Sequence, residues 1–151
     1  MYLTHTRPDI SYAVSVASRY MDQPHEIHWK VAKRILNFVQ GTRTHGIFYK
    51  AKSDLHLIGF TDSDWEGDNI DRKSTSRYVF IPNEGPISWS SKKQSAIALS
   101  SIEAEYRGVV NAATQCLWLQ GLLGECGFES EYSTTIYYDN QITIRICNDP
   151  I

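Results

Sequence analysis

Apolar residues recur every three or four positions in the first part of the chain, the spacing of amphipathic helices. One such pattern predicts a helix over residues 10–20, with Asp9 placed to cap its start. A second predicts a helix with Pro24 in its first turn and Gly41 at its end. The two stripes consist of Ile10, Val14, Ala17 and Met21, and of Ile27, Val31, Ile35 and Phe38. Residues 1–45 are therefore expected to form a helical hairpin.

The middle of the chain changes to β-branched and aromatic runs with the two-residue period of strands. These runs predict strands over residues 46–50, 55–62, 78–81 and 87–89, separated by polar turns. Short connections between consecutive strands favour an antiparallel meander of three or four strands. The basic, hydroxyl-rich segment 90–94 is expected either to be a solvated connection or to offer donors to phosphate groups.

A long helix is predicted after the meander, with Ser100 or Ser101 as its cap and Glu103 in capping-box position. It should end near Gly124, and its predicted apolar face consists of Ile102, Tyr106, Val109, Ala113, Cys116 and Leu117. A β-rich segment, 134–138, then leads to Asp139, and a last helix is expected to begin at Asp139 or Asn140. The order of elements indicates the α/β class.

Composition narrows the class without deciding the function. The 151 residues suffice for one domain, or one domain plus an appendage, and the net charge of −2 argues against a strongly polybasic protein. The three cysteines show no metal-ligand or disulfide spacing. No apolar run is long enough for a membrane span, and no signal-peptide pattern is present. The sequence therefore predicts an intracellular protein, cytoplasmic or nuclear, without a membrane partner.

Two carboxylates, Asp62 and Asp64, lie at the end of the strand predicted at 55–62 and project to the same side of its pleat. Their repulsion requires a compensating cation or a wet exit loop. One interpretation is a divalent-metal site, because hard cations such as Mg²⁺ take carboxylate oxygens. The alternative is a strand that ends in a solvated turn.

Three further acids are candidates for the same metal site. Glu103 and Glu105 flank the predicted apolar face of the long helix on opposite sides, so periodicity does not choose between them, and Asp139 ends a later strand. If the strands ending at Asp62 and Asp139 are parallel neighbours, their ends meet, and the helix start can lie over them. Converging carboxylates are what two-metal phosphoryl transfer requires. By spacing alone this indication is weak, because any α/β domain carries acids at strand ends.

Five ordered segments carry a resemblance to a known family. TDSDW at 61–65, DRKSTS at 71–76, ISWSSKKQ at 87–94, ALSSIEAEY at 98–106 and DNQ at 139–141 resemble the ribonuclease H region of Ty1/copia-type retrotransposon polyproteins. Residues 2–9, 33–36 and 41–42 resemble the end of the reverse transcriptase and its connection to that region. The resemblance extends over essentially the whole chain. It implies a helical remnant of that connection at 1–45 and a ribonuclease H-like domain at 46–151.

The implied fold is a mixed sheet, with three antiparallel strands followed by parallel ones and with helices packed on it. The implied activity is that of a nuclease, a hydrolase that uses Mg²⁺ or Mn²⁺ to cleave the RNA strand of an RNA–DNA hybrid. Asp62, Glu105 and Asp139 match the catalytic, metal-binding carboxylates of the family, with Asp64 as a neighbour. The matched contacts to nucleic acid are Arg72, Lys73, Ser74, Lys92, Lys93, Asn140 and Gln141. The rest of a reverse transcriptase polyprotein is a further implied partner.

Two departures from the family pattern shape the expected activity. The fourth carboxylate of the family would lie beyond Ile151, so we expect weak or no catalysis from this truncated chain. Arg77 stands where the family usually has glycine, and it would be strained if that position needs a positive φ angle. One alternative is a domesticated, non-catalytic fragment that binds nucleic acid or protein. Another is an interaction domain whose acids are ordinary surface residues.

Overall fold

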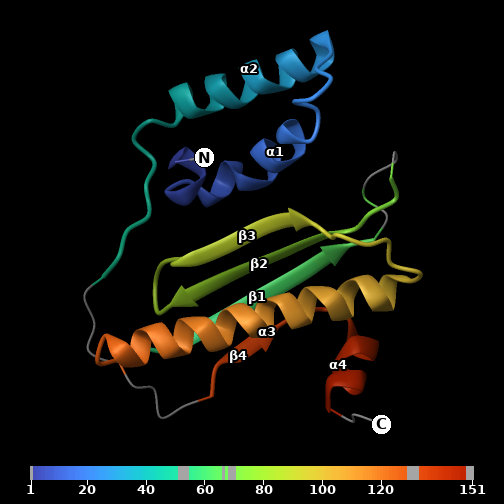
Figure 1. The fold of residues 1–151 in the computed structure, drawn as a ribbon. Helices are drawn as coiled ribbons and strands as arrows, with labels where there is room; N and C mark the ends of the chain where they lie inside the picture. Colours follow the sequence, from blue (N-terminus) through green and yellow to red (C-terminus); the bar gives the residue numbers. More distant parts are fainter. Residues whose placement is uncertain (1, 51–54, 66, 68–70, 129–132, 149–151) are drawn as a thin grey trace. The chain divides into compact units, whose positions relative to one another are not determined.

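A computed structural model describes residues 2–50, 55–65, 67, 71–128 and 133–148. The chain divides into two compact units, Met1–Phe48 and Tyr49–Ile151. The first holds a 3₁₀ turn, Tyr2–His5, followed by helices α1, Pro8–Ser18, and α2, Glu26–Gly41. The second holds a sheet with two helices (Figure 1). None of the helices among the described residues has the length and apolar character needed to cross a membrane.

Helices α1 and α2 pack together as the predicted hairpin, and the buried Arg7 links their ends. Its guanidinium donates to the carboxylate of Asp9 at 2.6 Å and to the hydroxyl of Thr42 at 2.7 Å. The predicted capping role of Asp9 is wrong, because α1 already begins at Pro8 with Arg7 in the N-cap position, so Asp9 lies in the first turn of the helix. Helix α2 begins after Pro24, with His25 and His28 in a reciprocal capping box. No residue of α2 is buried, so its apolar stripe is only partly covered.

The second unit contains a mixed sheet in the order β3-β2-β1-β4. Strands β1, Leu57–Asp64, β2, Thr75–Pro82, and β3, Ser88–Lys93, form the predicted antiparallel meander. Strand β4, Thr135–Tyr137, pairs with β1 in parallel. The α/β class and the mixed sheet with one parallel pair are thus confirmed, and β4 leads to helix α4, Gln141–Asn148.

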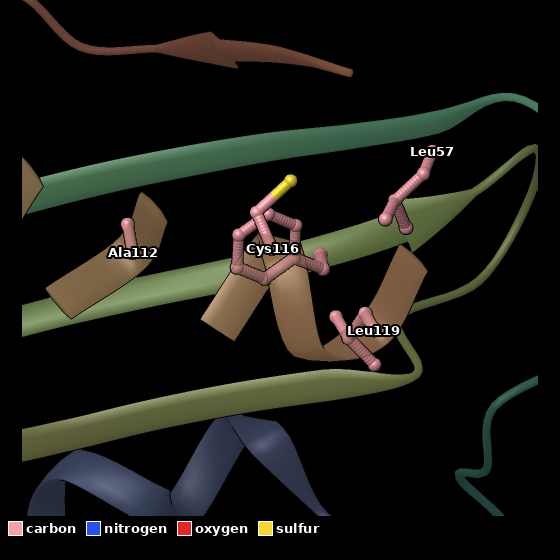
Figure 2. Close-up of a cluster of buried hydrophobic side chains, with 5 residues drawn as sticks. Leu57, Ala112, Cys116 and Leu119 are labelled. Atoms are coloured by element: carbon pink, nitrogen blue, oxygen red, sulfur yellow. The ribbon is translucent and has the colours of Figure 1, made fainter. Parts of the chain in front are cut away.

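Helix α3, Ser101–Glu125, lies across one face of the sheet (Figure 1). The core between them contains Leu57 of β1, Phe80 of β2, and Ala112, Cys116 and Leu119 of α3, whose packing is drawn in Figure 2. The apolar face predicted for α3 is partly wrong, because Tyr106 and Leu117 are 44% and 70% exposed. The buried face instead carries small residues (Ala104, Gly108, Ala112, Cys116) and Leu119, since the sheet approaches the helix closely there.

One predicted strand of the sheet is wrong, and the structure contradicts one of the two alternatives for segment 90–94. Residues 46–50 form no strand, and Tyr49 instead uses its hydroxyl to donate to the carbonyl of Pro86 at 2.7 Å. Segment 90–94 is not a solvated connection, because Ser90–Lys93 continue β3 and pair with β2. Gln94 follows directly and is 7% exposed. Its amide donates to Ser76 and to the carbonyl of Ala104, so the strand end is fixed to the start of α3.

Candidate metal centre

The parallel pairing of β1 and β4 brings two aspartates to one edge of the sheet. Phe60 pairs with Tyr137 in the register of these strands, and each aspartate lies two residues further on. Asp62 and Asp139 are therefore neighbours, although β1 does not end at Asp62 as predicted but continues to Asp64. The third acid, Glu105, comes from the second turn of α3. One carboxylate oxygen from each of the three side chains lies within 4.8 Å of the other two.

Local contacts place Glu105 at this edge. The side chain of Ser100 accepts a hydrogen bond from the backbone of Glu103 at 3.1 Å and fixes the first turn of α3. The buried Gln94 amide holds the next residue, Ala104, through its carbonyl at 2.9 Å. One turn further, Gly108 faces Ser63 of β1 so closely that a Cβ atom there would collide with the serine hydroxyl. Small side chains thus allow α3 to lie directly on β1 beside Asp62.

The neighbouring charges change the acidity of Glu105. Partial burial, followed by the charges of Asp62 and Asp139, raises the pKa of Glu105 from 4.5 to about 7. The fold has therefore gathered three acids whose full ionisation is unfavourable without a cation. Three carboxylate oxygens from separate elements form a hard donor set that fits Mg²⁺ or Mn²⁺. The arrangement can bind such an ion without a side-chain ligand of another type.

Two nearby acids have other partners. Glu103 forms a salt bridge with Arg107 at 2.7 Å and accepts a hydrogen bond from the backbone of Leu99 at 2.8 Å. Asp64 lies beside the guanidinium of Arg77, with an oxygen 3.5 Å from its Nη2 atom. The geometry therefore separates the two glutamates, which periodicity did not, because only Glu105 joins Asp62 and Asp139.

The sequence did not reveal the pairing of Arg77 with Asp62. The two residues lie opposite each other on β1 and β2, and Nη1 of Arg77 donates to Oδ2 of Asp62 at 2.8 Å. Arg77 is not among the described residues with positive φ angles, so the strain considered for this position is not present. Knowledge of the strand register could have identified the pair, because directly opposed side chains on one face meet.

The seven residues matched to nucleic-acid contacts occupy different surroundings. Arg72, Lys92 and Gln141 are exposed, and Lys73 is partly buried. Lys93 forms a salt bridge with Asp71 at 2.8 Å. Asn140 caps α4, accepting hydrogen bonds from the backbone of Ile142 and Thr143. Ser74 is fully buried and is inaccessible to a phosphate in this structure.

Lys92 and Lys93 also border a hollow between β3 and α3, with a volume of about 360 Å³. Its wall includes the polar side chains of Ser76, Ser90, Gln94 and Asn111. Both basic residues of β3 therefore line this hollow, and Lys93 in addition pairs with Asp71.

Fold and site together define an α/β domain with a three-carboxylate candidate metal site at the edge of a mixed sheet. The chain is 44% identical over 150 residues to a retrovirus-related Pol polyprotein from transposon RE2 of Arabidopsis thaliana, and 45% identical to the one from transposon RE1. These relatives are retrotransposon Pol polyproteins, and the similarity extends over essentially the whole of this chain. Each match covers 99% of this chain and 10% of the polyprotein, so the chain spans about a tenth of these relatives.

A relative of similar size has a different name. The chain is 43% identical over 120 residues to secreted RxLR effector protein 161 of Plasmopara viticola. That match covers 79% of this chain and 84% of the effector protein. No protein-family model and no solved structure matches the chain.

Proposed function

We propose that this chain is a retroelement-derived ribonuclease H-like domain that acts on the RNA strand of an RNA–DNA hybrid. The observation that carries the proposal is the convergence of Asp62, Glu105 and Asp139, with oxygens within 4.8 Å. Three elements far apart in the sequence supply these acids, and burial and charge raise the pKa of Glu105 to about 7. The similarity to retrotransposon Pol polyproteins supports a retroelement origin of the chain.

In the proposed site, Asp62, Glu105 and Asp139 would hold Mg²⁺ or Mn²⁺. When bound, such ions supply an activated water and stabilise the leaving oxygen in phosphodiester hydrolysis. Asp62 and Asp139 are fixed by the pairing of β1 with β4, so the protein sets the spacing of two ligands in advance. Glu105 would have to lose its proton to complete the donor set, so metal binding would be favoured above the pKa of its carboxyl group.

A hybrid would be recognised through its backbone and its 2′-hydroxyl groups rather than through its base sequence. Arg72, Lys92 and Gln141 are exposed and can serve as donors to phosphate or sugar oxygens. Lys93 and Asn140 have the other contacts described above, so their contribution to binding would require those contacts to be exchanged or shared. Within a polyprotein, the remainder of the reverse transcriptase would be a partner of this segment.

Cleavage of a labelled RNA–DNA hybrid tests the proposal. The unchanged chain should cut the RNA strand slowly with Mg²⁺ or Mn²⁺ and stop when EDTA is added. Asp62→Asn and Glu105→Gln should abolish cleavage, because each removes an anionic ligand. Glu125→Gln makes the same change at the exposed far end of α3 and should leave the rate unaltered. Equal cleavage by the unchanged chain and Asp62→Asn would rule out the proposed site.

The second candidate is a non-catalytic module that binds nucleic acid or protein. Two observations favour it: Arg77 already neutralises Asp62, and a relative of similar length is named an effector protein rather than a polyprotein. The same assay distinguishes the candidates when hybrid binding is followed in parallel by fluorescence anisotropy. If the chain binds the hybrid in a metal-dependent manner but cleaves it with neither Mg²⁺ nor Mn²⁺, the non-catalytic module is the correct candidate.

A further inference from the structure

We propose that Arg77 is a tethered cation that competes with divalent metal ions for Asp62 and keeps the metal affinity of the site low. This inference rests on the proposed metal site, and it assigns to that site a residue outside its ligand set. Nη1 of Arg77 lies 2.8 Å from Oδ2 of Asp62, and Nη2 lies 3.5 Å from Oδ2 of Asp64. One guanidinium thus contacts both carboxylates that leave β1 on this face.

The position of Arg77 is fixed by the sheet rather than by a mobile loop. It lies in the middle of β2, directly opposite Asp62 in the antiparallel register, with one third of its side chain exposed. A guanidinium keeps its charge at every pH at which the protein is folded. The cation is therefore present whenever the acidic cluster is, and only a rotation of its side chain can remove it from Asp62.

The competition follows from charge and geometry. Asp62 carries one negative charge, and Arg77 already holds one of its two oxygens. A divalent ion bound among oxygens that lie within 4.8 Å of each other would sit close to the guanidinium and be repelled by it. Metal binding therefore requires Arg77 to withdraw from Asp62, or to remain at an electrostatic cost. In both cases the apparent affinity for the ion is lowered.

Mn²⁺ binding measured at constant ionic strength tests this inference. Arg77→Gln should tighten the dissociation constant by about tenfold, the effect of one partly screened charge at this distance. Arg77→Lys keeps the charge and should stay close to the unchanged chain. Lys50→Gln is the matched control: it removes the same charge from a residue paired with Glu84 and should have no effect. An unchanged or weaker affinity of Arg77→Gln, or no binding by it at all, would overturn the inference.

A measurement on the unchanged chain does not depend on how the variants fold. The side-chain NMR signal of Arg77, assigned by its loss in Arg77→Lys, should shift as Mg²⁺ is added, with the same midpoint as the backbone amide of Asp62. A constant Arg77 signal while the Asp62 amide saturates would contradict competition.

The failure of the inference can be told apart from failure of the proposed site. Asp62→Asn should lose Mn²⁺ binding whether or not Arg77 is present. If Asp62→Asn binds as well as the unchanged chain, the proposed metal site is wrong and the role of Arg77 falls with it. If Asp62→Asn loses Mn²⁺ binding but Arg77→Gln does not bind Mn²⁺ more tightly than the unchanged chain, only the proposed role of Arg77 is wrong.

Discussion

At the scale of single residues, Glu105 should make stability depend on pH in the metal-free protein. Partial burial and the charges of Asp62 and Asp139 raise its pKa from 4.5 to about 7, so folding favours the protonated form. Its stabilising contribution is complete below about pH 4.5 and is lost as the pH rises through about 7. Thermal unfolding with EDTA should therefore show a midpoint that falls over this range, and Glu105→Gln should flatten that fall. A slope that persists in Glu105→Gln would assign it to other groups.

The sequence could place Asp62 and Asp139 because a strand end is a local feature. Apolar periodicity could not select Glu105 over Glu103, because the choice depends on which face of α3 meets the sheet; the family resemblance selected Glu105. Small residues line that face, whereas apolar periodicity predicted that Tyr106 and Leu117 would lie on it, and both are exposed. The pairing of Arg77 was hidden for a related reason, since it depends on the register between two strands.

At the scale of elements, the close contact of α3 with β1 depends on Gly108. A Cβ atom at this position would collide with the hydroxyl of Ser63, which is buried and bonded to Ser76 at 3.3 Å. Gly108→Ala should lower the free energy of unfolding by about 1–3 kcal/mol, as expected for overpacking. The same substitution in a Ser63→Ala background should cost less, because the colliding oxygen is gone. Chemical denaturation of the four proteins measures this difference.

Gly121→Ala provides a control on the same helix. Nothing lies within 4 Å of the position of its Cβ atom, so only helix propensity changes, and stability should rise by about 1 kcal/mol. An equal cost of Gly108→Ala with and without the Ser63 hydroxyl would show that the contact with β1 does not constrain α3.

The elements themselves were predictable where the local pattern and the tertiary contacts agree. Helix α3 with its Ser100 cap and the strands of the meander are of this kind. Residues 46–50 have a strand-like composition but pair with no strand among the described residues, and the side chains of Tyr49 and Lys50 instead contact Pro86 and Glu84. A strand is defined by its partner, which the local sequence does not contain.

At the scale of the whole molecule, the two compact units should respond differently to metal. The three carboxylates come from β1, α3 and the end of β4, all within Tyr49–Ile151. Helices α1 and α2 have their own contacts, including the salt bridge of Arg7 with Asp9. An ion that binds only the folded second unit stabilises that unit by mass action, and the gain grows with the ratio of free ion to dissociation constant.

Hydrogen exchange with and without Mg²⁺ measures this stabilisation element by element. Amides of β1, α3 and β4 should exchange more slowly with Mg²⁺, because opening of these elements separates the ligands. Amides of α1 and α2 should exchange at the same rate in both conditions. Asp62→Asn should remove the difference in the second unit, which separates specific binding from a general effect of salt. Equal slowing in both units, or in Asp62→Asn, would contradict a single metal site at this edge of the sheet.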